Sequence, residues 1–251
     1  MRAIALLIFC FSFFGFSQKN QLFEKANELY NDGKYVESIE KYESILESEV
    51  HSSELYFNLA NANYKLNNIA SSVYYYEKAL LLSPNDEEIK NNLAFARNMT
   101  VDAIDTVPDV GFAKILKNFV TTLSADTWAI IALIGVFVFV LLFLLYHFAQ
   151  ATSRKRLAFI ISVASLFVAC LSVAMAFQRV QLDNKDNPAI VFAQESRVKA
   201  DPNKMSEEVF RLHEGTKIQV LDTYEDWKKI QLSDNSIGWI PSEDIKLLSN
   251  F

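Results

Sequence analysis

The stretch "LYFNLANANYK", residues 55–65, predicts an amphipathic helix, because its apolar side chains recur every three or four positions. It is also one copy of a repeat. Asn58-Leu59-Ala60 recurs 34 residues later as Asn92-Leu93-Ala94, and Tyr42 recurs at the same interval as Tyr76. A period of this length is typical of helix pairs that stack on one another.

Small and aromatic residues in this period resemble the tetratricopeptide repeat. Ala26, Ala60 and Ala94 align where the first helix of a pair (helix A) would touch the second (helix B), and Pro84 ends the second helix B. The resemblance implies a helical tetratricopeptide domain over residues 18–99, closed by a third helix A, residues 86–99, that has no helix B. The alternative is a generic helical bundle.

Helix A lines the concave face of such a stack, and Asn27 and Asn61 occupy equivalent positions on it. Because an amide can both donate and accept hydrogen bonds, the face suits an extended segment of a partner protein. The candidate peptide-binding residues are Asn27, Tyr30, Phe57, Asn61, Tyr64 and Lys65. The alternative is that they form an ordinary solvated surface.

Two uncharged runs, residues 128–148 and 157–177, predict transmembrane helices, since each would extend about 30 Å. The alternative is a pair of buried core helices. The loop between the runs, residues 149–156, carries Arg154, Lys155 and Arg156 and no acidic residue. The positive-inside rule places this loop in the cytoplasm. Both flanking soluble parts are acidic overall, and we expect them in the periplasm of a bacterial inner membrane.

The chain starts with a predicted signal peptide, residues 1–17. Arg2 supplies the positive start, an apolar stretch follows, and Gly15 and Ser17 precede the expected cleavage site. The alternative is an uncleaved anchor. The two cysteines, Cys10 and Cys170, both fall in apolar segments, so the exported parts are expected to fold without disulfides.

Residues 100–127 read as a linker followed by an amphipathic helix. One face of that helix carries apolar side chains at 112, 115, 116, 119, 120 and 123. Because the segment directly precedes the first apolar run, we expect it to lie in the membrane interface rather than to bind a partner.

Short β-type runs separated by turn residues follow from residue 189 to 250. Glu214-Gly215-Thr216, then Trp227-x-x-Ile-x-Leu, then Gly238-Trp239-Ile240 resemble the bacterial SH3-like domain, which implies a small all-β barrel that binds peptides or cell-wall glycopeptide. Tyr224, Trp227 and Trp239 are the candidate ligand residues, because their rings offer stacking surface. The alternative is that the tryptophans form the core.

No pattern in the sequence predicts catalysis. His51 and His213 fall in different domains, and neither has Cys or His at metal-ligand spacing. Phosphate-binding loops and nucleophile elbows are also missing from the sequence, so no catalytic residue, metal or cofactor is expected. The acidity of both soluble parts argues against nucleic acid as a partner.

The whole order of segments resembles the BatE family, membrane components of aerotolerance (Bat) operons. The resemblance implies association with other Bat proteins, including von Willebrand factor A domain proteins, and with a MoxR-type ATPase system, in oxidative-stress tolerance or envelope integrity. We therefore expect a non-catalytic membrane scaffold. The alternative is a peptidoglycan-binding protein that positions or regulates a cell-wall enzyme.

Overall fold

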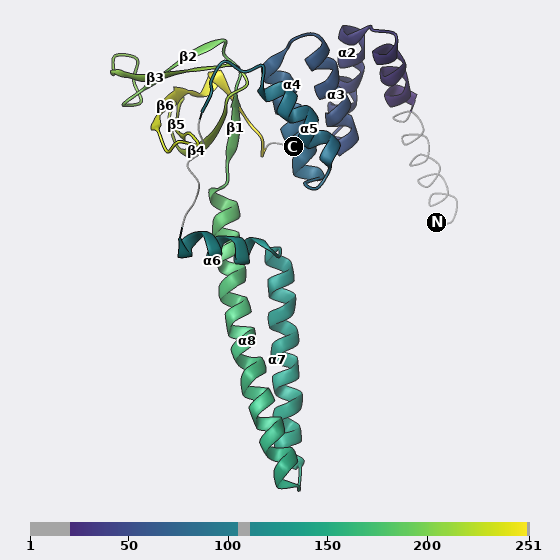
Figure 1. The fold of residues 1–251 in the computed structure, drawn as a ribbon, viewed down its shortest axis with the longest axis vertical. Coiled ribbons are helices and arrows are strands. Elements are labelled where there is room, and N and C mark those ends of the chain that lie inside the picture. Colours follow the sequence, from purple (N-terminus) through teal and green to yellow (C-terminus); the bar gives the residue numbers. More distant parts are fainter. Residues whose placement is uncertain (1–20, 105–110, 250–251) are drawn as a thin grey trace, which may run out of the picture. The chain divides into compact units, whose positions relative to one another are not determined.

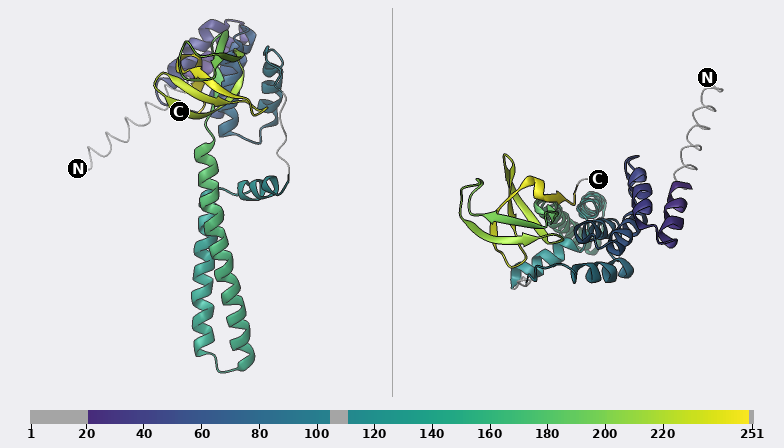
Figure 2. Two further views of the ribbon diagram at one scale, coloured as in Figure 1. Left: turned by 90° about the vertical axis from the view of Figure 1, so that its left-hand side faces the viewer. Right: turned by 90° about the horizontal axis from the view of Figure 1, so that it is seen from above.

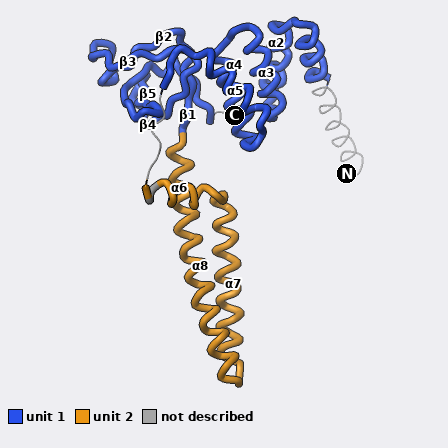
Figure 3. The backbone as a smooth tube through the Cα atoms, in the orientation of Figure 1, with its two compact units in different colours: residues 1–106, 187–251 blue, residues 107–186 orange. Residues whose placement is uncertain are grey.

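The computed structural model describes residues 21–104 and 111–249, so the predicted signal peptide lies outside the described residues. The chain forms two compact units (Figure 3). One contains Met1–Thr106 and Asn187–Phe251, and the other is Val107–Asp186.

The helical part of the first unit is a stack, as predicted (Figure 1). Residues 21–31 are helical, and the helices after them are α2 (Tyr35–Leu46), α3 (Ser53–Lys65), α4 (Ile69–Leu82) and α5 (Glu87–Arg97). The Ser52 hydroxyl caps α3 by accepting from the backbone N–H of Leu55 at 3.1 Å. The Asp86 carboxylate caps α5 in the same way.

Small residues let the helices approach closely, and the repeat depends on them. Ala26 and Ala60 are completely buried at equivalent positions, and the hydroxyl of buried Ser38 donates to the Ala26 carbonyl at 2.9 Å. Tyr42 and Tyr76 are buried at equivalent positions in α2 and α4. In the first two repeats the periodicity in the sequence is therefore the periodicity of helix contacts, whereas Ala94, the equivalent residue of α5, is exposed.

Seven short strands follow in the same unit, and every pairing between them is antiparallel. Their order across the sheet is β3-β2-β6-β5-β4-β1-β7. The strands are β1 (Pro188–Val191), β2 (Glu195–Lys199), β3 (Glu208–His213), β4 (Lys217–Tyr224), β5 (Trp227–Gln231), β6 (Ile237–Pro241) and β7 (Ile245–Leu247), with a short 3-10 helix, Ser242–Asp244, before β7.

All seven strands contribute to one buried cluster, so the sheet curves around its core. This confirms the small SH3-like all-β fold. In the ladder of strand pairs, β3 and β7 are the two edge strands.

The helical stack and the sheet share a hydrophobic core, which the sequence did not predict. Ile190 of β1 and Leu248 are completely buried in the same cluster as Val73 of α4 and Ala96 of α5. These residues of β1 and of the segment after β7 extend the core of the stack into the sheet. Ile104, which follows α5 in the sequence, packs against the buried cluster of the sheet.

Two carboxylates reinforce this joint between stack and sheet: Glu77 is buried and Asp102 is partly buried. Glu77 of α4 contacts both Arg97 of α5 and Lys217 of β4, the latter at 2.8 Å. Asp102 accepts hydrogen bonds from the His213 backbone N–H at 2.7 Å and from the Thr216 hydroxyl at 2.6 Å, and the His213 ring lies against its other oxygen. Because these partners are far apart in sequence, the joint links elements from both ends of the chain.

The described part of the second unit, residues 111–186, contains three helices, α6 (Phe112–Thr121), α7 (Ala125–Phe148) and α8 (Thr152–Lys185). The last two form a hairpin, and both are long and apolar enough to cross a membrane (Figure 1). Gly135 of α7 lies against Ala169 of α8. A Cβ at residue 135 would approach the Ala169 Cβ to 3.0 Å, so glycine allows the close helix contact.

The hairpin differs from the prediction at its bend and at its end. Because α8 begins at Thr152, the predicted loop of residues 149–156 is shorter, and Arg154, Lys155 and Arg156 lie in the first turns of the helix. The helix also continues past residue 177 to Lys185. Both extensions lack Gly and Pro, so nothing in the sequence interrupts the helix there.

Candidate functional site

The predicted asparagines on the helix-A face are held in a repeated network. The Asn27 side-chain oxygen accepts from the Tyr42 hydroxyl at 2.6 Å and from the Asn58 amide at 3.0 Å. Asn61, 34 residues later, accepts from the Tyr76 hydroxyl and from the Asn92 amide. The sequence repeat is therefore also a repeat of hydrogen bonds.

The orientation of these amides follows from their hydrogen bonds, in which the hydroxyls of Tyr42 and Tyr76 donate to the asparagine oxygens. Burial raises the pKa of Tyr42 to about 12 and raises the pKa of Tyr76 as well. The amide oxygen of each asparagine is thus used inside the protein. Within residues 21–104 and 111–249, the amide nitrogens of Asn27 and Asn61 donate to no protein group, and both residues are partly exposed, so each nitrogen can donate to a ligand.

The other predicted residues surround these amides. Phe57, Asn61, Tyr64 and Lys65 follow helical spacing on one side of α3, where Phe57 packs at 5.9 Å against the Tyr76 ring. Tyr64 is half-buried and Lys65 is exposed. Tyr30 packs edge to face with Tyr35 at 5.3 Å.

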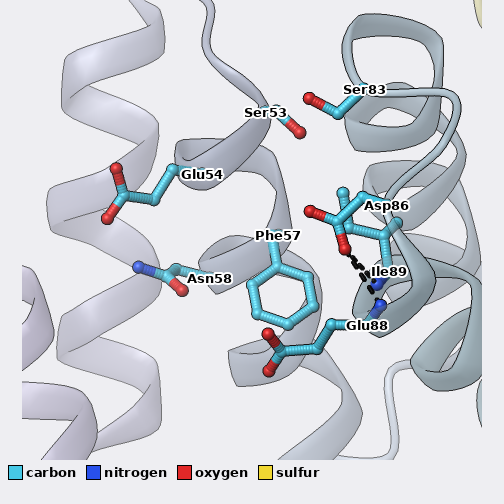
Figure 4. A pocket seen from close by; sticks show the side chains of 8 residues that line it. All are labelled: Ser53, Glu54, Phe57, Asn58, Ser83, Asp86, Glu88 and Ile89. Atoms are coloured by element: carbon cyan, nitrogen blue, oxygen red, sulfur yellow. Dashed lines mark hydrogen bonds between the residues drawn. The ribbon is translucent and has the colours of Figure 1, made fainter.

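A cavity of about 360 Å³ opens beside Phe57, between α3 and the start of α5 (Figure 4). Its lining is mostly polar and includes three carboxylates. The lining residues are Ser53, Glu54, Phe57, Asn58, Ser83, Asp86, Glu88 and Ile89. The charge of this lining favours a ligand with a cationic group beside the Phe57 ring.

The sequence interpretation missed this cavity, although the repeat contained a signal for it. Glu54 and Glu88 are equivalent positions, 34 residues apart, and Glu54 lies one helical turn before Phe57 and Asn58. Asp86 caps α5, and it also lines the cavity.

The three predicted aromatic residues of the sheet lie on one face. Trp227 pairs with Tyr224 of β4 and with Pro241 of β6, while Lys229 pairs with Trp239. Because side chains alternate along a strand, these residues face away from Ile230 and Ile240, which are buried in the core. Tyr224 is 54% exposed, and the Lys229 ammonium lies 5.9 Å from the centre of the Trp239 ring. The tryptophans are therefore outside the buried core cluster.

The basic cluster at the start of α8 does not stabilise this helix. Arg154, Lys155 and Arg156 lie where the helix dipole is positive, and the N-cap residue Ala151 provides no side-chain cap. Positive charge is unfavourable at this end of a helix. Helix stability therefore does not account for the cluster.

Each histidine of the two soluble parts lies within hydrogen-bonding distance of a side chain. The His51 ring lies 2.7 Å from the Tyr56 hydroxyl, and the His213 ring lies 2.7 Å from the Asp102 carboxylate. Across the described ranges, no group of three or more His, Cys, Asp or Glu side chains could hold a metal ion.

Comparisons with known proteins support both soluble folds. Residues 53–86 match the tetratricopeptide repeat, and residues 195–246 match the bacterial SH3 domain. Comparison with curated proteins gave no match. The chain thus combines a tetratricopeptide stack, a bacterial SH3-like sheet and two helices long enough to span a membrane. The repeat match covers α3, α4 and the cap of α5, and the structure adds the helices on either side.

Proposed function

We propose that this protein is a non-catalytic scaffold of the bacterial inner membrane that holds an extended segment of a partner protein on its helix-A face. The repeated network around Asn27 and Asn61 carries this proposal. It fixes two amide donors at equivalent positions of successive repeats, and donors at regular intervals suit the carbonyl groups of an extended peptide. Because the network is already formed, the face needs little ordering when it binds.

The cavity beside Phe57 adds a charge preference. Glu54, Asp86 and Glu88 favour a partner segment with Lys or Arg next to the peptide backbone held by the asparagines. Tyr30, Tyr64 and Lys65 extend the same face with aromatic and basic side chains.

The proposed setting is a Bat-type complex, with von Willebrand factor A domain proteins as partners and a MoxR-type ATPase system nearby, acting in oxidative-stress tolerance or envelope integrity. The order of the segments supports this proposal. The basic residues at the bend of the hairpin support an orientation with both soluble parts in the periplasm, by the positive-inside rule.

Site-specific crosslinking in native membranes tests the binding face. A photoreactive residue replaces Phe57 in the full chain, and a matched control replaces Lys41, which is exposed on α2. We expect a discrete crosslinked product from position 57 that is lost when Asn61→Ala is added, and none from position 41. Equal products from both positions, or a product insensitive to Asn61→Ala, would contradict the proposal.

A second candidate function is binding of peptidoglycan by the sheet. The observation that favours it is the outward face formed by Tyr224, Trp227 and Trp239, because aromatic rings stack on sugar rings. Because the sheet shares its core with the helices, the test uses the detergent-solubilised full chain on purified sacculi. Retention that falls with Tyr224→Ala, at unchanged thermal stability, supports this function. Retention unaffected by Tyr224→Ala or Trp239→Ala rejects it.

A further inference from the structure

One side of α6 is apolar and open. Ile115 is 67% exposed and Phe119 is 52% exposed, and Leu116 on the same side is also exposed. These residues follow helical spacing, while Lys114, Lys117 and Asn118 lie on other sides of the helix. A short amphipathic helix with exposed bulky side chains needs something apolar to cover them.

The end of α6 is fixed to the hairpin. Val120 is completely buried, and its carbonyl accepts a hydrogen bond from the Trp128 indole at 3.1 Å. The Phe119 ring packs against the Trp128 ring at 5.5 Å. Arg179 of α8 reaches the Thr121 carbonyl at 3.5 Å. The C-terminal end of α6 is therefore held against α7 and α8, and Figures 1 and 2 show the helix beside one end of the hairpin.

These contacts place α6 at one defined level of the hairpin. Trp128 is the first residue of the apolar run in α7, and Arg179 comes just after the run in α8 that ends at residue 177. Both partners of α6 thus mark the boundary between apolar and polar sequence. In a membrane this boundary lies at the headgroup level, where Trp and Arg are favoured.

We infer that α6 is a lipid-binding helix whose face of Ile115, Leu116 and Phe119 enters the upper acyl region of the leaflet and sets the depth of the hairpin. The inference rests on the proposed membrane insertion of α7 and α8. We take lipid, rather than a protein partner, to cover this face of α6. The hairpin in the same unit also exposes apolar side chains, such as Leu133 and Leu141, and a lipid bilayer would cover both surfaces. An interfacial helix gains its binding energy from apolar area of this kind.

Depth-dependent quenching tests the inference on the full chain. Single cysteines replace Ile115, Asn118 or Leu141 in a Cys10→Ser/Cys170→Ser background and carry an environment-sensitive fluorophore. The protein is reconstituted in phosphatidylcholine vesicles with nitroxides either near the headgroup or deep in the acyl chain. We expect the shallow nitroxide to quench position 115 about twofold more than position 118. Position 141 should respond most to the deep nitroxide.

The three positions separate the possible failures. If position 141 is quenched and position 115 is no more quenched than position 118, lipid binding by α6 is wrong while insertion of the hairpin stands. If emission at position 115 shifts to the blue without quenching, protein covers the face, and the inference is also wrong. If position 141 is not quenched, the hairpin is not inserted, and the proposed membrane location fails with it.

Discussion

The joints inside the helical stack and the joint between stack and sheet are built from different contacts. Inside the stack, each joint repeats small residues such as Ala26 and Ala60 and the hydrogen bonds of Asn27 and Asn61. The joint with the sheet has no counterpart elsewhere in the repeat. It uses Leu248 and Ile190 in the core, together with the carboxylates of Glu77 and Asp102.

This difference changes how the two soluble folds should be regarded. Two separate modules on a membrane hairpin would bind partners independently. A shared core makes them one folding unit, because unfolding of the sheet would expose Val73 and Ala96 of the helices to water. A partner on the helix-A face and a ligand on the aromatic face of the sheet therefore bind one body.

Truncation of Leu248 should have the largest effect on this shared core. Its side chain is completely buried, so Leu248→Ala is expected to lower the free energy of unfolding by about 2–5 kcal/mol. In a Trp128→Phe background, urea unfolding is followed by circular dichroism for the helices and by the fluorescence of Trp227 and Trp239 for the sheet. The urea midpoints from both signals should fall together in Leu248→Ala. Leu221→Ala, at an exposed position, should change neither midpoint. A shift in fluorescence alone would show that the folds are separate.

Alanine substitutions at two glycines test how closely the stack and the sheet approach each other. Gly215 has φ +84°, and a Cβ there would lie 2.7 Å from the Thr100 side chain and 3.0 Å from that of Ile69. Gly33 has a similar φ of +77° and nothing within 4 Å of the added Cβ. We expect Gly33→Ala to cost about 1 kcal/mol from backbone strain alone. Gly215→Ala should cost about 2–3 kcal/mol, because overpacking of the joint is added. Equal costs would contradict a tight joint.

Much of the stack could be predicted from the sequence because its contacts repeat. Ala60 and Tyr76 each predict an equivalent residue 34 positions away, and the strands of the sheet follow from alternation and turn residues. The joint could not be predicted, since Glu77 and Lys217 meet through folding and no pattern links them. The cavity was missed for a similar reason, because it forms only when the starts of α3 and α5 come together.

Acid should weaken the joint through Asp102. Burial alone would raise the pKa of this carboxyl, but hydrogen bonds from Thr216 and from the backbone and ring of His213 outweigh it and lower the pKa below its usual value. The stabilisation is therefore present above the unfolded-state pKa of about 3.9 and is lost as the pH falls through the lower folded-state pKa.

The Asp102→Asn variant tests this assignment. At neutral pH we expect it to lose about 1 kcal/mol of stability with the charge-assisted hydrogen bonds. Below about pH 4 the difference from the wild type should shrink. Thermal melts of the variant and the wild type from pH 7 to pH 3 measure the loss at neutral pH and its decrease in acid. A stability difference between the two proteins that stays constant across that range would mean that Asp102 does not titrate as proposed.

The smallest expected change in stability comes from Asn61→Asp, which separates the structural role of the amide from its binding role. Aspartate keeps an oxygen that accepts from Tyr76 and Asn92, so stability should stay within about 0.5 kcal/mol of the wild type. It removes the amide nitrogen that faces outward, so crosslinking from position 57 should be lost. Asn61→Ala removes both groups and should lower stability as well, because the buried Tyr76 hydroxyl loses its acceptor. If Asn61→Asp still crosslinks, the amide donor does not contribute to binding, and the asparagine network serves only to join one repeat to the next.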